Sequence, residues 1–153
     1  GRTPTDMEAP TTLRLARAFK NIVAVKEASG NIAQGMDLVK GAPDGFSVLS
    51  GDDPLILAQM ALGFNGVISV AGNCFPQMFS EMVRKAAKNQ YNEARALHYQ
   101  MLEAVLLLFA EGNPTGIKCM LNLKGVCQNE LRLPLIKATK ALERKMAPFI
   151  DIQ

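Results

Sequence analysis

Three short apolar runs constrain the fold of this chain more than any other feature. They occupy residues 22–25, 46–49 and 66–70, and valine, isoleucine or similar apolar residues dominate each of them. Continuous apolar runs without strict alternation are typical of strands that are buried on both faces of a parallel sheet. Their starts are about 20 to 24 residues apart, which leaves room for one crossover helix between neighbours. The chain is therefore predicted to contain repeated βα units.

Helical segments are predicted between and around these runs. Asp53 is expected to cap the helix that ends near Leu62, because Pro54 follows it at the first helical position. After Val70 the pattern indicates helices only. The predicted helices are residues 11–19, 32–40, 54–62, 76–88, 91–110, 114–125 or 114–126, and 134–147.

Composition excludes several classes of protein. With 48% hydrophobic and 20% charged residues, the 153-residue chain is typical of a globular protein. The net charge of +3 is spread along the sequence without a basic run, so nucleic-acid binding is not expected. The longest apolar stretch, residues 104–110, is far shorter than the ~18 residues of a membrane span. The three cysteines form no C-x-x-C pair and His98 is remote from them, which argues against zinc and favours reduced thiols in the cytoplasm.

Lys26 is the candidate for chemistry. A lysine at a strand end is more often a surface residue with a solvated amine. However, active-site residues of βα folds gather where parallel strands end, and three polar or glycine-rich motifs follow the three runs, at residues 26–30, 50–53 and 69–73. Residues 1–3 would follow a strand that this chain lacks. Capping explains Asp53 without a metal, so none is expected.

The order of these motifs identifies a family resemblance. Gly-Arg-Thr at residues 1–3, Val-Lys-Glu-Ala-Ser-Gly at 25–30, Leu-Ser-Gly-Asp-Asp at 49–53 and Gly-Val-Ile-Ser-Val at 66–70 resemble the dihydrodipicolinate synthases. These belong to the lysine-dependent class I aldolase superfamily that includes N-acetylneuraminate lyase. The resemblance covers nearly the whole chain and matches the family's C-terminal half, although Pro4 stands where many relatives have glycine.

The resemblance implies an α/β fold that forms the C-terminal part of a (β/α)8 TIM barrel with about three strands, followed by a helical C-terminal region. Residues 1–75 would form the partial barrel with its last three strands. Residues 76–153 would form the last barrel helix and the helical region. A three-stranded parallel piece cannot close into a barrel by itself, so we expect a missing N-terminal half as a partner.

The same resemblance implies a lyase of lysine and diaminopimelate biosynthesis. It would condense pyruvate with aspartate semialdehyde through a Schiff base on Lys26, which requires a neutral amine and therefore a partly buried site. Arg2 would hold the carboxylate of the aldehyde substrate, while Gly51 and Ile68 would line the pyruvate pocket. No cofactor or metal is implied. The expected protein is a cytoplasmic homo-oligomer, such as a homotetramer.

Two alternatives stay open. The imine lysine is shared with N-acetylneuraminate lyase and with keto-deoxy sugar-acid aldolases, although the motif that contains Arg2 favours the synthase. A noncatalytic half-barrel that assembles with a partner is the second alternative, since the apolar helix around residues 105–109 could serve it. The family's proton-relay tyrosine and its threonine pair lie outside this chain. We therefore expect the 153-residue fragment alone to be inactive or nearly so.

Overall fold

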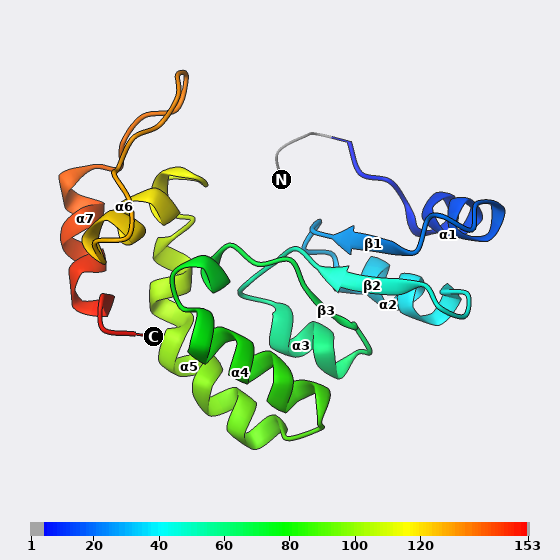
Figure 1. Cartoon of the computed structure of the whole chain (residues 1–153). Helices are drawn as coiled ribbons and strands as arrows, with labels where there is room; N and C mark the ends of the chain where they lie inside the picture. The colour runs from blue at the N-terminus through cyan, green and yellow to red at the C-terminus, as the bar shows by residue number, and fades with distance from the viewer. Residues whose placement is uncertain (1–4, 153) are drawn as a thin grey trace. The chain divides into compact units, whose positions relative to one another are not determined.

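The computed structural model describes residues 5–152 and divides into two compact units (Figure 1). The first unit runs to Ser69 and also includes Val83–Gln90. The second comprises Val70–Met82 and begins again at Tyr91.

A three-stranded parallel sheet forms the centre of the first unit. Its strands β1 (Ala24–Glu27), β2 (Ser47–Ser50) and β3 (Gly66–Val67) lie in the order β1-β2-β3. Lys26 pairs in register with Leu49 across β1 and β2. The predicted three parallel strands are therefore confirmed. The third strand was predicted over residues 66–70 but ends at Val67, so it is shorter than predicted.

Among the described residues, three helices lie wholly in this unit: α1 (Ala9–Ala18), α2 (Ile32–Gly41) and α3 (Ile56–Ala61). The prediction for the start of α3 was wrong. The helix begins at Ile56 with Leu55 as its N-cap and no capping side chain, so Asp53 does not cap it. The backbone N–H of Leu55 instead donates to the carbonyl oxygen of Asp52 at 3.1 Å, which makes residues 53–55 a turn before the helix.

The two faces of the sheet differ, because successive residues of a strand point to opposite sides. Val48 and Phe46 are buried on one side in a core with Leu13 of α1 and Leu38 of α2. We call this side the covered face. The expectation that the strands are buried on both faces was wrong for this chain. Lys26 and Ala24, two residues before it, are exposed on the opposite side, which we call the open face. The helices α1 and α2 pack on the covered face.

Helices make up the second unit. It contains the 3-10 turns η1 (Ala71–Asn73) and η2 (Ala147–Phe149), with α5, α6, α7 and the first part of α4. The bounds of these helices are Pro76–Ala87 for α4, Tyr91–Leu107 for α5, Thr115–Leu123 for α6 and Lys140–Met146 for α7. A Cβ on Gly116 would lie 2.1 Å from the carbonyl oxygen of Leu108. The start of α6 therefore packs against the chain that leaves α5.

The last predicted helix was too long. Residues 134–139 are not helical, and α7 begins at Lys140 after Thr139, whose hydroxyl accepts a hydrogen bond from the N–H of Leu142 at 3.2 Å. The Glu111 carboxylate accepts the hydrogen bonds of the Thr139 backbone N–H and hydroxyl. These contacts fix the start of α7. In the described part of the chain, no helix is both long and apolar enough to cross a membrane.

Candidate active site

The Lys26 side chain and the backbone of Gly51 lie against each other at the carboxyl ends of β1 and β2. A Cβ built on Gly51 would lie 2.6 Å from Lys26 Cε and 3.1 Å from Lys26 Cγ. Both distances are shorter than the ~3.5 to 4.0 Å at which carbon atoms pack. Gly51 follows Ser50 of the covered face, so alternation places it on the open face with Lys26. The structure thus brings these two predicted residues together.

Ile68 lies at the end of the neighbouring strand. Its backbone N–H donates to the carbonyl oxygen of Ser50 at 2.9 Å, one residue beyond the end of β3. Its side chain is 51% exposed, which agrees with a position on the open face. Lys26, Gly51 and Ile68 therefore occupy the same edge of three adjacent strands. The fourth predicted site residue, Arg2, lies outside the described residues.

The loops after β1 and β2 approach each other at this edge. Gly30 ends the first loop with a φ of +74°, a conformation that favours glycine. A Cβ on Gly30 would lie 3.6 Å from Oδ2 of Asp52 in the second loop. The Gly51 N–H also donates to the Glu27 carbonyl oxygen at 2.7 Å, which joins the two loops directly. Two of the predicted motifs, at residues 26–30 and 50–53, are therefore neighbours in space.

Glu27 is a buried carboxylate directly after Lys26, on the covered face. It is only 5% exposed, and its two oxygens accept hydrogen bonds from different donors. The Ser29 backbone N–H donates to Oε1 at 2.7 Å, and the Gln34 side-chain amide donates to Oε2 at 2.9 Å. A buried carboxylate needs such partners, because an unpaired one would be costly. Glu27 therefore ties the loop after Lys26 to helix α2.

Ser50 and Gln59 form a second buried polar pair on the covered face. Both are at most 1% exposed, and the Ser50 hydroxyl donates to Oε1 of Gln59 at 2.5 Å. The same hydroxyl oxygen accepts a hydrogen bond from the Asp52 backbone N–H at 3.0 Å. These two hydrogen bonds of the Ser50 hydroxyl anchor the loop that carries Gly51. Sequence reasoning did not single out Gln59, although a glutamine within an apolar helix is a visible signal.

Asp52 lies half-buried in this loop. Burial raises the pKa of its carboxyl group above the ordinary value, and the negative charge of Asp53 adds to the rise. A hydrogen bond from the backbone of Leu55 opposes both effects. Within residues 5–152, no group of three or more His, Cys, Asp or Glu side chains is placed to hold a metal ion.

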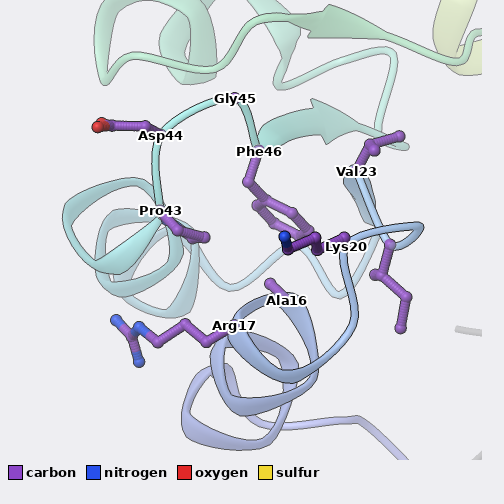
Figure 2. A pocket seen from close by; sticks show the side chains of 9 residues that line it. Ala16, Arg17, Lys20, Val23, Pro43, Asp44, Gly45 and Phe46 are labelled. Atoms are coloured by element: carbon purple, nitrogen blue, oxygen red, sulfur yellow. The ribbon is translucent and has the colours of Figure 1, made fainter.

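A separate pocket of about 330 Å³ lies at the opposite, amino-terminal ends of β1 and β2 (Figure 2). Its lining includes the aromatic ring of Phe46 and the charged residues Arg17, Lys20 and Asp44. The Arg17 guanidinium donates to the carbonyl oxygen of Gly41 at 2.8 Å, and the Asp44 carboxylate points away from Phe46. Its polar groups do not converge on a common point, in contrast to the usual arrangement of a ligand site.

Comparisons with known proteins agree with this geometry. The sequence profile of the dihydrodipicolinate synthetase family matches residues 1–153. The chain belongs to this family. It is 54% identical over 136 residues to the 4-hydroxy-tetrahydrodipicolinate synthase of Parabacteroides distasonis, covering 89% of this chain and 46% of that protein. It is 48% identical over 151 residues to the synthase of Phocaeicola vulgatus, covering 99% of this chain and 51% of that protein.

Solved structures of the family match the fold. The crystal structure of dihydrodipicolinate synthase from Aquifex aeolicus superposes with a TM-score of 0.91 at 39% identity, covering 95% of this chain and 50% of that one. The predicted fold class, part of a (β/α)8 barrel followed by helices, is thereby confirmed. The chain spans about half the length of the curated relatives it matches.

Proposed function

We propose that this chain supplies the imine-forming part of a 4-hydroxy-tetrahydrodipicolinate synthase, a lyase of lysine and diaminopimelate biosynthesis that condenses pyruvate with aspartate semialdehyde. The observation that carries the proposal is the position of Lys26. Its amine stands on the open face at the carboxyl end of β1, where active sites of (β/α)8 barrels are found. Membership of the family supports the same assignment.

The chemistry begins with the neutral amine of Lys26. It adds to the ketone carbon of pyruvate, and loss of one water leaves a C=N bond. The protonated imine withdraws electrons from the neighbouring methyl carbon, which loses a proton to give an enamine. The enamine carbon then forms a bond to the aldehyde carbon of aspartate semialdehyde. The aldehyde oxygen takes up a proton, and the amino group of the semialdehyde then adds to the imine carbon and displaces the amine of Lys26, which completes the turnover.

The other site residues would bind the two substrates. Gly51 lies beside Lys26 at the end of β2 and Ile68 lies beyond it at the end of β3, so their backbones would line the pyruvate pocket. Arg2 would bind the carboxylate of aspartate semialdehyde, since a guanidinium forms two parallel hydrogen bonds to a carboxylate. The open face also supports a partner: a further half of the barrel would cover Lys26 and pair with the free edge of β1.

Three broader features remain proposals. The division into a barrel part, residues 1–75, and a helical part, residues 76–153, follows the family resemblance. Assembly into a homo-oligomer, such as a homotetramer, and a cytoplasmic location also follow from it. Size-exclusion chromatography with light scattering would test the oligomer on a full-length polypeptide, in which this chain replaces the matching half of the Parabacteroides distasonis synthase. A monomer at working concentration would contradict it.

Trapping of the imine tests the reaction. We define the full-length protein as one polypeptide in which this chain replaces the matching half of the Parabacteroides distasonis synthase. Treatment with pyruvate and borohydride should reduce the imine to a stable adduct on Lys26, detected by peptide mass spectrometry. Absence of that adduct would contradict the proposal. Turnover with sugar aldehydes but not with aspartate semialdehyde would replace the synthase with a related aldolase.

The isolated 153-residue chain provides a further prediction. We expect no measurable condensation, because half of the barrel and the expected proton-relay tyrosine are missing from it. The measurement is product formation by the chain alone and by the full-length protein at equal concentration. Comparable turnover by the two samples would contradict the need for a second half.

A further inference from the structure

Gly51 has a contact that its proposed place in the pyruvate pocket does not explain. A Cβ on this residue would lie 2.6 Å from Lys26 Cε and 2.5 Å from the Cβ of Ala28. Lys26 and Ala28 are two residues apart, so both point to the open face. The lysine stem and the Ala28 Cβ therefore occupy the space that a side chain at position 51 would need.

We propose that Gly51 is a positioning residue for Lys26. In this role the bare Cα of Gly51 packs against the lysine stem and directs the amine toward the substrate's ketone carbon. The inference rests on the proposed imine chemistry of Lys26, and it assigns Gly51 an action on the lysine in addition to any contact with pyruvate. A larger residue at position 51 would push the stem aside and misplace the amine.

The loop that holds Gly51 is anchored by hydrogen bonds, whereas the lysine side chain is a flexible four-carbon stem. The Gly51 N–H donates to the Glu27 carbonyl oxygen at 2.7 Å. On the next residue, the Asp52 N–H donates to the Ser50 hydroxyl oxygen at 3.0 Å, and that hydroxyl donates to buried Gln59. The clash with a new Cβ at position 51 would therefore be relieved by rotation of the exposed Lys26 side chain before any movement of the loop.

The size of the displacement sets the expected effect. Moving Lys26 Cε from 2.6 Å to an ordinary carbon–carbon contact requires about 1 Å. A misplacement of about 1 Å at a reacting group can cost ~100-fold in rate. The contact with Ala28 is different, because the Cβ of Ala28 is fixed to the backbone. It would strain the fold whether or not Lys26 has any chemical role.

A double variant separates these two effects. Gly51→Ala with Ala28→Gly removes the fixed Cβ at position 28 and leaves Lys26 Cε as the close neighbour of the new methyl group. Ala28→Gly alone is the matched background, since it leaves the contact between Gly51 and Lys26 unchanged. Gly35→Ala is the control for crowding elsewhere, because its Cβ would lie 2.8 Å from the ring of Phe64, away from Lys26.

The measured quantity is the rate of borohydride trapping by the full-length protein across a range of pyruvate concentrations. We expect the double variant to trap at saturating pyruvate ~100-fold more slowly than Ala28→Gly, which should stay within a few fold of the parent. Gly35→Ala should lower the unfolding midpoint but trap at the parent rate below that midpoint. Melting curves of all variants identify any that are unfolded.

Two results would overturn the positioning role. One is a double variant that traps at the rate of Ala28→Gly at saturation. The other is a double variant that needs more pyruvate for half-maximal trapping but reaches the same rate, which would make Gly51 a binding residue only. If the parent protein forms no adduct on Lys26, the proposed function itself fails, and this outcome is distinct from both.

Discussion

The covered and open faces of the sheet in the first unit use the same strands for different purposes. On the covered face, Glu27, Ser50 and Gln59 are buried, and protein hydrogen bonds satisfy them. On the open face, Lys26 and Ile68 are exposed, and Gly51 contributes only its backbone. Alternation along each strand thus places residues that hold the loops next to residues that are available for chemistry.

Stability and reactivity can therefore be separated at single positions of the same strand. Glu27 follows Lys26 directly, yet the two side chains point to opposite faces. Ser50 and Gly51 show the same alternation at the end of β2. Truncation of exposed side chains on the open face should therefore change catalysis with little effect on folding, and truncation of buried side chains on the covered face should mainly lower stability.

Lys26→Met gives the largest expected effect. The full-length variant should lose the borohydride adduct and at least ~10³-fold in condensation rate, because methionine has no nucleophilic amine. Its unfolding midpoint in urea should not fall, since no buried hydrogen bond is removed. Lys20→Met is the control, an exposed lysine at the other end of the sheet. Parent-like turnover by Lys26→Met would disprove the division between the faces.

Glu27→Ala tests the covered face next to Lys26. Removal of the carboxylate leaves the Ser29 N–H and the Gln34 amide without their acceptor, which should cost ~1–3 kcal/mol of unfolding free energy. Urea denaturation of the full-length protein measures it. Glu8→Ala is the control, because Glu8 is exposed and its side chain makes no capping hydrogen bond. Equal losses in the two variants would show that burial of Glu27 is unimportant.

The sheet was largely predictable from the sequence, and its open face was not. The apolar runs predicted three parallel strands and the helices between them, because β-branched residues between turn signals carry a strong local pattern. The same runs predicted burial on both faces. Burial on both faces depends on what packs against the strands. Among the described residues the helices cover one face, so Ala24 and Lys26 stay exposed.

The candidate site was predictable to a similar degree. Lys26 and Gly51 meet because carboxyl ends of parallel strands share an edge, a rule that requires no side-chain detail. The burial of Glu27 was not predicted, because its donors include Gln34, seven residues away on a helix. The assignment of Asp53 as a helix cap was also wrong. The Asp-Pro pattern indicates a helix start, but residues 53–55 form a turn first.

The buried pair of Ser50 and Gln59 provides a smaller test of the covered face. Ser50→Ala, Gln59→Met and the double variant form a cycle in the full-length protein. We expect each single change to lower the unfolding free energy by ~1 kcal/mol or more, because it removes the hydrogen bond between two buried polar side chains. The double variant should cost ~0.5 kcal/mol or more less than the sum. Strict additivity would mean that the two side chains act independently.

Asp52 gives the smallest effect and lies at the border between the two faces. Burial raises the pKa of its carboxyl group in the folded state above 3.8, so the folded protein binds a proton there more tightly than the unfolded chain does. The resulting stabilisation is complete below pH 3.8 and is lost as the pH rises through the folded-state pKa. At neutral pH the ionised group therefore costs stability.

Asp52→Asn should raise the urea midpoint at neutral pH, and the gain should shrink as the pH falls toward 3.8. Asp44→Asn, at an exposed site on the opposite end of the sheet, controls for the loss of one negative charge from a chain of net charge +3. A gain for Asp52→Asn that is equal at both pH values would show that shape, and not the buried charge, limits this loop.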